Sequence, residues 1–221
     1  MNNIKAVIFD MDGVIFDTER LILDCWLELG EQRGIQGNIK EVFSACIGTN
    51  KDKTKEIVLT NLGADFPYDE FSKVTSRMFR EKAADGGIPI KSGVCDTLEK
   101  LKEMGMPLGL ASSTRLAIVK EELGDAGLLK YFDEVVGGDL IKKSKPEPDI
   151  YLLACEKLGY APDECIAIED SYNGIISAYR AGLHPVMIPD LLKPTLQMEQ
   201  MSEVILNSME ELIPWLMCIG E

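Results

Sequence analysis

The sequence predicts an α/β fold built on a doubly wound, mostly parallel sheet, with a helical segment inserted near the N-terminus. Short apolar runs alternate with stretches of helical periodicity along most of the chain, which is typical of strands joined by helices. One long segment interrupts this alternation because it shows helical periodicity alone. The 221 residues are enough for a sizeable core that carries such an insertion.

Five short apolar runs are predicted to form the sheet. They span residues 4–9, 107–111, 134–136, 165–168 and 185–188. A buried parallel strand reads as a continuous apolar run because both of its faces are covered. Polar residues follow three of these runs: Asp10, then Ser112-Ser113-Thr114, then Glu169-Asp170. Ligands of such sheets bind beyond the carboxyl ends of the strands, so these residues should converge on one rim.

Glycines end the helices that are predicted between the strands. The helical stretches 94–104, 147–158 and 174–181 are followed by Gly105, Gly159 and Gly182. Glycine is common just beyond a helix end because it adopts the left-handed conformation without steric cost. Each helix therefore ends where the alternating pattern requires the chain to return to the sheet.

The segment from residue 17 to residue 87 is predicted to be an inserted helical bundle. Apolar residues recur in it at helical spacing, for example Leu21, Cys25, Trp26 and Leu29. Trp26 is expected to pack inside this bundle. Gly13 and Gly86-Gly87 supply permissive backbone near the two crossings. We therefore expect a core domain of residues 1–16 and 88–221 and a helical domain of residues 17–87.

The composition excludes several classes of partner. A net charge of −14 argues against nucleic acid, which needs a basic surface. No apolar run approaches the roughly 20 residues of a membrane-spanning helix. The first residues lack the pattern of a signal peptide, so a cytoplasmic protein without a membrane partner is expected. The acidity also means that a site for anions would need a bound cation and local Lys or Arg side chains.

Cysteine and histidine are too sparse and too scattered for a zinc site. The six cysteines form no Cys-x-x-Cys pair, and His184 is the only histidine. We expect the thiols to be ordinary buried or half-buried side chains. His184, which enters a predicted strand far from the acidic motifs, is expected to be structural.

The segment Asp10-Met11-Asp12-Gly13 is the strongest chemical signal. Two carboxylates at positions i and i+2, at the end of a buried strand, are costly unless a cation neutralises them. Glu169 and Asp170 would bring four acids to one rim, which suits a hard ion such as Mg²⁺. The alternatives are a structural acid cluster or a stabilising Ca²⁺ loop. An EF-hand loop is excluded because its glycine is the sixth residue, whereas Gly13 is the fourth.

Ser112 and Lys145 are candidates for binding an anion. The hydroxyl of Ser112 and the backbone N–H groups of Ser113 and Thr114 could bind a phosphate near a helix N-terminus. The alternative is that Ser112 caps the helix that begins near Arg115. Lys145 precedes Pro146, which should begin a new helix. A solvated loop lysine is the alternative, but the nearby acids favour a catalytic cation.

These motifs resemble those of the haloacid dehalogenase-like hydrolase superfamily. The ordered set is Asp10-x-Asp12-Gly13, Ser112, Lys145-Pro146 and Glu169-Asp170-Ser171-x-x-Gly174, which spans nearly the whole chain. Each motif alone is weak, whereas four in this order are specific. The helical insertion after the first motif is similar to the cap of the β-phosphoglucomutase-like and small-metabolite phosphatase branch.

The resemblance implies a two-step phosphoryl transfer. Asp10 would attack phosphorus to form an aspartyl-phosphate, while Asp12 would protonate the leaving alcohol and then activate water. The implied Mg²⁺ ligands are Asp10, the backbone carbonyl of Asp12, Asp170 and, directly or through water, Glu169. Lys145 and Ser112 would bind the phosphoryl oxygens, with Ser113 and Thr114 beside them, and Glu19 and Lys51 of the cap are further candidates for substrate binding.

Three functions are compatible with acids and a lysine at the strand ends of such a sheet: a phosphatase, a β-phosphoglucomutase-type isomerase, and a phospho-acceptor receiver module. Receivers are shorter and lack a large insertion, and a dehalogenase would not need Asp12. Where the mutase has a histidine, this chain has Ile22. Where the mutase has an arginine, this chain has Lys51, in the segment Gly48-Thr49-Asn50-Lys51. The mutase also has a further cap lysine, for which Arg77 is the nearest match. We therefore expect a Mg²⁺-dependent phosphatase of small phosphorylated metabolites, acting as a monomer.

Overall fold

The computed structural model describes residues 3–47 and 51–219, and it divides into two compact units. We call the first the sheet unit, which comprises Met1–Phe16 and Ile90–Glu221. The second, the helical unit, comprises Asp17–Pro89. Each unit is described by itself below.

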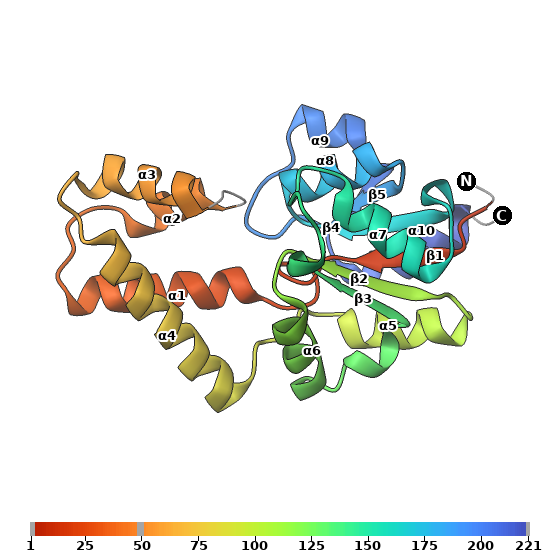
Figure 1. Cartoon of the computed structure of the whole chain (residues 1–221), viewed down its shortest axis with the longest axis horizontal. Coiled ribbons are helices and arrows are strands. Elements are labelled where there is room, and N and C mark those ends of the chain that lie inside the picture. The colour runs from red at the N-terminus through yellow and green to blue at the C-terminus, as the bar shows by residue number, and fades with distance from the viewer. Residues whose placement is uncertain (1–2, 48–50, 220–221) are drawn as a thin grey trace. The chain divides into compact units, whose positions relative to one another are not determined.

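The described residues of the sheet unit form one sheet of six parallel strands, of which Figure 1 labels β1 to β5. They are β1 (Ala6–Phe9), β2 (Leu108–Ser112), β3 (Glu134–Gly137), β4 (Cys165–Glu169), β5 (His184–Met187) and β6 (Val204–Ile205). Their order in the sheet is β3-β2-β1-β4-β5-β6. From β1 the chain first builds one side of the sheet and then crosses to build the other. The carboxyl ends of β1 and β4 therefore form the switch point at which such sheets bind ligands.

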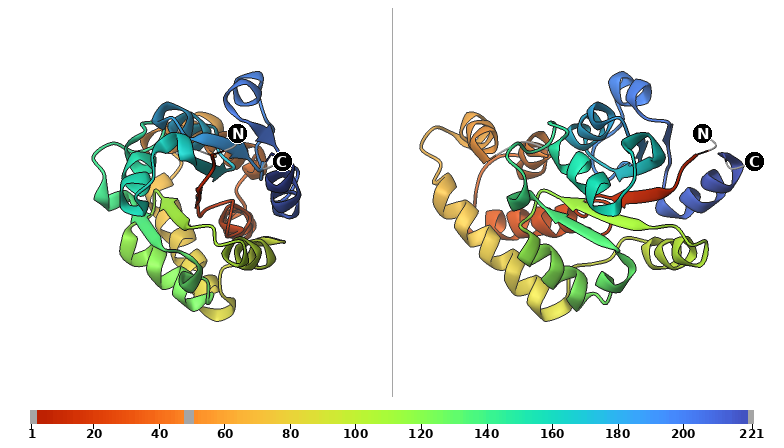
Figure 2. Two further views of the ribbon diagram at one scale, coloured as in Figure 1. Left: turned by 90° about the vertical axis from the view of Figure 1, so that its right-hand side faces the viewer. Right: turned by 45° about the vertical axis from the view of Figure 1, so that its right-hand side comes forward.

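Helices cover both faces of this sheet. They are α5 (Val94–Glu103), α6 (Leu116–Asp125), α7 (Asp149–Leu158), α8 (Tyr172–Ala181), α9 (Leu196–Met201) and α10 (Leu212–Ile219). Four single-turn 3₁₀ helices lie at Leu129–Tyr131, Gly138–Leu140, Pro162–Glu164 and Met209–Glu211. Figure 2 shows α7 and α8 on one face of the sheet and α5 and α6 on the other. This double cover explains why β1 and β4 are buried along their whole length, and the predicted doubly wound fold is confirmed.

Several element boundaries differ by one or two residues from the sequence-based expectation, and one strand was missed. Helix α7 begins at Asp149 rather than residue 147, and the expectation that Pro146 begins this helix is wrong. Residue 147 directly precedes Pro148, and the residue before a proline is disfavoured in the helical conformation. Helix α8 begins two residues early, at Tyr172, because the side chain of Ser171 accepts a hydrogen bond from Gly174 N. Strand β6 was not predicted, because a strand of two residues is too short to show an apolar pattern in the sequence.

In the described part of the helical unit, four helices pack around an aromatic centre. They are α1 (Thr18–Gln32), α2 (Ile39–Cys46), α3 (Lys51–Leu62) and α4 (Tyr68–Gly86). Trp26 is only 6% exposed and makes edge-to-face contacts with Phe43 and Phe71, with ring centroids 5.3 and 5.2 Å apart. The expectation that Trp26 packs inside this bundle is confirmed.

Two further expectations concern the surface of the protein. Within the described ranges, no helix has both the length and the apolar character that a membrane crossing demands. His184 lies at the start of β5, where its Nδ1 is 2.7 Å from Glu203 Oε1 and its Nε2 is 3.1 Å from the carbonyl of Asp163. These contacts link β5 to neighbouring loops and suit the expected structural role.

Candidate active site

The first site segment follows β1. Asp10 is 7% exposed, and its backbone N–H donates to the carbonyl of Ile168 on β4 at 2.9 Å, so it is fixed to the neighbouring strand. Gly13 has a φ of 81°, and a Cβ there would overlap the carboxylate of Asp170. The turn after β1 thus requires a glycine for its backbone conformation and for the space that Asp170 occupies.

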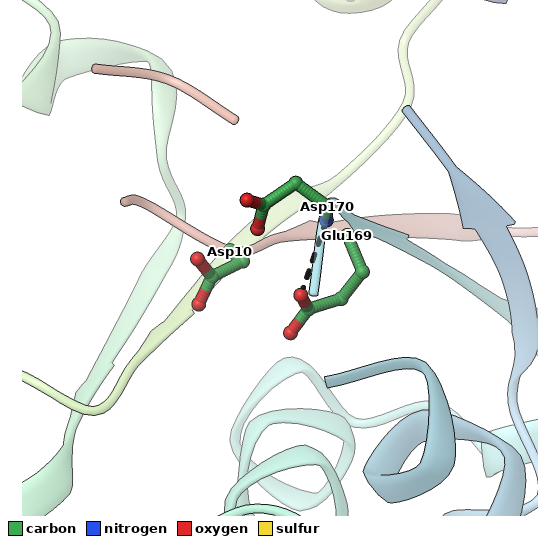
Figure 3. Close-up of side chains that lie close together, drawn as sticks. All are labelled: Asp10, Glu169 and Asp170. Carbon is green, nitrogen blue, oxygen red and sulfur yellow. Dashed lines mark hydrogen bonds between the residues drawn. The ribbon is translucent and has the colours of Figure 1, made fainter. Parts of the chain in front are cut away.

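The second site segment is the end of β4. Glu169 is fully buried and Asp170 is 6% exposed. One carboxylate oxygen from each of Asp10, Glu169 and Asp170 lies within 4.8 Å of the others, and Figure 3 shows the three side chains gathered at the ends of their strands. The strand register, with Phe9 opposite Ile168, produces this convergence because the acids directly follow paired residues.

Lys145 lies between these acids. Its Nζ donates to Asp10 Oδ1 at 2.5 Å, to Glu169 Oε1 at 2.6 Å and to the carbonyl of Ala111 at 3.1 Å. Only 8% of its side chain is exposed. The alternative of a solvated loop lysine is therefore wrong, because this ammonium has three acceptors inside the protein.

Burial dominates the electrostatics of this cluster. Burial raises the pKa of Asp10 to about 8; Lys145 opposes that rise, and Glu169 and Asp12 reinforce it. Burial alone would lower the pKa of Lys145, but Asp10 and Glu169 outweigh burial and raise it above its ordinary value. Lys145 therefore keeps its positive charge. This single charge is not enough to neutralise the carboxylates that surround it.

A hard divalent cation fits this donor set. Asp10, Glu169 and Asp170 offer buried carboxylate oxygens close together, and oxygen ligands of this kind are the ones that Mg²⁺ prefers. A bound cation would also compensate the negative charge that raises the pKa of Asp10. The cluster can therefore hold a metal ion beside a carboxylate and an ammonium.

The loop after β2 approaches the same rim. Ser112 is fully buried, and its Oγ accepts a hydrogen bond from Thr114 N at 3.1 Å. Thr114 Oγ1 in turn donates to Asp12 Oδ2 at 3.4 Å, which links this loop to the turn after β1. Ser112 does not cap α6, because that helix begins at Leu116, whose N–H donates to Asp139 Oδ1 at 2.8 Å. The N-cap interpretation of Ser112 is therefore wrong.

Tyr151 is a site residue that the sequence analysis did not identify. Its hydroxyl donates to Glu169 Oε1 at 2.8 Å, and its side chain is fully buried. In the sequence it occupies an apolar position of a helix, which is the pattern of any core residue. No signal in the sequence distinguishes its hydroxyl from an ordinary buried phenol.

The two candidates from the insertion lie in the helical unit. Glu19 is half-buried in the first turn of α1, and Lys51 is exposed at the first residue of α3. The preceding residues 48–50, which belong to the same segment as Lys51, lie outside the described part of the chain. Arg77 is exposed on α4, with its Nε 3.7 Å from Glu81 Oε1. The roles of Glu19 and Lys51 in substrate binding stay predictions.

The fold and this cluster define a class of α/β enzymes that carry carboxylates and a lysine at the switch point of a parallel sheet. The model of the haloacid dehalogenase-like hydrolase family matches residues 7–188, and the chain belongs to this family. The predicted family and fold class are confirmed by this match.

Known relatives include a phosphatase and a mutase. The chain is 34% identical to a phosphorylated carbohydrates phosphatase of Thermotoga maritima over 82% of this chain and 83% of the relative. It is 30% identical to the β-phosphoglucomutase of Bacillus subtilis over 94% of each chain. The crystal structure of CbbY from Rhodobacter sphaeroides in complex with phosphate is similar, with 27% identity, a TM-score of 0.72, and coverage of 95% of this chain and 96% of that one. The family and the phosphatase relative support the class of phosphoric monoester hydrolase.

Proposed function

We propose that this protein is a Mg²⁺-dependent phosphatase of small phosphate monoesters, such as sugar phosphates, that reacts through an aspartyl-phosphate on Asp10. The observation that carries this proposal is the buried cluster in which Lys145 bridges Asp10 and Glu169 beside Asp170. The Thermotoga maritima relative, which acts on phosphorylated carbohydrates, supports the substrate class.

The first step uses both acids of the turn after β1. A carboxylate oxygen of Asp10 attacks phosphorus, the bond from phosphorus to the alcohol oxygen breaks, and Asp12 donates its proton to that oxygen. Asp12 is half-buried and accepts from Thr114 at 3.4 Å, so a neighbouring hydroxyl orients its carboxyl group.

The second step returns the enzyme to its starting state. The carboxylate of Asp12 takes a proton from a water molecule, whose oxygen attacks phosphorus and releases Asp10 and inorganic phosphate. Lys145, with its pKa held above the ordinary value, keeps its charge and binds phosphoryl oxygens in both steps. The hydroxyl of Ser112 and the backbone N–H of Ser113 bind the remaining oxygens, while the N–H of Thr114 donates to Ser112 Oγ and orients that hydroxyl.

Asp10, the backbone carbonyl of Asp12 and Asp170 would hold Mg²⁺, with Glu169 ligating directly or through water. The ion would supply positive charge that stabilises the transferring phosphoryl group. The protein buries these acids, and burial keeps their carboxylates directed at the position where the ion would bind.

A mutase is the second candidate, because the Bacillus subtilis β-phosphoglucomutase matches nearly the whole chain. A mutase must grip a bisphosphate at both ends and keep water from the aspartyl-phosphate. Ile22 cannot form a side-chain hydrogen bond, and Lys51 lacks the planar fork of arginine. These two residues favour hydrolysis. Action as a cytoplasmic monomer stays an expectation.

The test is a screen of phosphorylated sugars, polyols and nucleotides for released inorganic phosphate in the presence of Mg²⁺, with the Asp10→Asn variant as control. Release from several monoesters by the wild type alone would support the proposal. A parallel reaction supplies β-glucose 1-phosphate with a trace of glucose 1,6-bisphosphate. Rapid formation of glucose 6-phosphate with little free phosphate would favour the mutase instead.

A further inference from the structure

We propose that Tyr151 is a positioning residue for phosphoryl transfer, because it holds the Glu169 carboxylate and, through it, the Lys145 ammonium in place. This inference rests on the proposed function. Tyr151 lies in the first turn of α7, and its hydroxyl donates to Glu169 Oε1 at 2.8 Å. Lys145 donates to that same oxygen at 2.6 Å. One carboxylate oxygen therefore joins the phenol to the lysine.

The other oxygen of Glu169 is also occupied. Oε2 accepts from Asp170 N at 3.2 Å, from Ser171 N at 3.4 Å and from Ser171 Oγ at 3.1 Å. These three donors belong to the residues that directly follow Glu169, so they orient the carboxylate from its own strand end. Tyr151 is the donor that fixes Oε1 from a different element. Without it, Oε1 would be held by Lys145 alone, and that lysine must also bind the phosphoryl group.

The ring of Tyr151 also faces the ammonium. Lys145 Nζ lies 5.0 Å from the ring centroid, within the range of a cation–π contact. The same side chain therefore contacts both members of the ion pair, the carboxylate with its hydroxyl and the ammonium with its ring. A phenol is a proton donor at neutral pH, so this arrangement does not depend on titration near pH 7.

The place of Tyr151 is set by the core of the sheet unit. The side chain is fully buried in a cluster with Ile150, Ala154 and Cys155 of the same helix. Its backbone N–H donates to the carbonyl of Pro148 at 3.1 Å. A tyrosine side chain has only two main torsions, so packing of the ring leaves the hydroxyl little freedom. The packing of α7 therefore fixes the hydroxyl of Tyr151, and the hydrogen bond from that hydroxyl holds Glu169 in place.

A purely structural tyrosine is the alternative, in which the hydroxyl only satisfies its own hydrogen-bonding need. Phenylalanine would fill the same space and keep the ring beside Lys145. Tyr151→Phe therefore removes the hydroxyl alone. Tyr160→Phe is the matched control, because Tyr160 packs against the same core cluster and the same change is made there. Tyr151→Met, which also removes the ring, serves as a second variant.

The kinetic test measures kcat, KM and inhibition by orthovanadate, a mimic of the phosphoryl transition state, well below the melting temperature of every variant. We expect Tyr151→Phe to lower kcat by about ten-fold, equivalent to about 1.4 kcal/mol, with KM changed by less than about two-fold. Binding of orthovanadate with Mg²⁺, measured by calorimetry, should weaken by about the same factor. Tyr151→Met should lose more, and Tyr160→Phe should match the wild type.

Crystal structures of the wild type and Tyr151→Phe give a readout that does not depend on turnover. We expect the Glu169 carboxylate to rotate and Lys145 Nζ to move relative to Asp10 in the variant. Unchanged positions together with wild-type kcat would overturn the inference. If the wild type releases no phosphate from any monoester, the proposed function fails, and the two structures still decide whether Tyr151 positions Glu169.

Discussion

Exchange of Gly174 for alanine should disable the site while the protein stays folded. Gly174 lies in the first turn of α8, and its N–H donates to Ser171 Oγ at 3.1 Å. A Cβ at this position would overlap the carboxylate of Glu169, which is fully buried and cannot move into solvent. The carboxylate must therefore shift, and its contact with Lys145 shifts with it.

The expected change in the free energy of unfolding of Gly174→Ala is the balance of two opposing effects. Alanine is favoured over glycine inside a helix by about 1 kcal/mol, while an extra carbon in a packed site costs about 1–3 kcal/mol. The free energy of unfolding should therefore fall by about 0–2 kcal/mol, which lowers Tm by a few degrees. Misdirecting one hydrogen bond to a charged group costs about 1.5–3 kcal/mol, so kcat should fall by about 10- to 100-fold.

The assay measures kcat for phosphate release and Tm by calorimetry, with Gly124→Ala as the matched control. Gly124 is an exposed residue of α6, and nothing lies within 4 Å of a Cβ built there. That control should raise the free energy of unfolding by up to about 1 kcal/mol and leave kcat unchanged. A Gly174→Ala enzyme with wild-type kcat and a raised Tm would refute the reasoning.

Three further predictions concern the acids. The pKa of Asp10 is raised to about 8 in the metal-free protein, so its contribution to stability is present below about pH 4 and is lost as the pH rises through about 8. In chelator, Asp10→Asn should therefore gain more stability over the wild type at about pH 8 than at about pH 5, as measured by urea unfolding. Excess chelator should abolish phosphate release, and full turnover in chelator would contradict this prediction. Mg²⁺ should raise Tm because it binds the native state. Ca²⁺ should inhibit phosphate release because its coordination is looser. Asp12→Asn should lose turnover but still form some phospho-enzyme, which mass spectrometry of the quenched reaction would detect.

Much of the sheet unit was predictable because its strands are covered on both faces. Residues 4–9 and 165–168 read as uninterrupted apolar runs, and each is followed by the acids that the structure brings together. The carboxyl ends of parallel strands lie at the same edge of a sheet. Residues that directly follow such strands are therefore expected to converge, as Asp10 does with Glu169 and Asp170.

The contacts that were missed depend on spacing in three dimensions rather than on pattern. Tyr151 and Glu169 are 18 positions apart and belong to different elements, so nothing local marks their hydrogen bond. The link from Thr114 to Asp12 spans 102 positions. Ser112 was given two possible roles because a hydroxyl before a helix suits either of them, and only the observed start of α6 at Leu116 removed the capping role.

The long separations within the cluster mean that its chemistry exists only in the completed chain. Lys145 and Asp10 are 135 positions apart, and Lys145 reaches Glu169 across a further 24. Contacts between distant segments pay the entropy of closing long loops, so they form after local helices have appeared. A partly synthesised or partly folded chain therefore has the nucleophile without its partners. The recovery of activity during refolding should therefore report the assembly of the whole cluster, in which Lys145 bridges Asp10 and Glu169, rather than the formation of the helices.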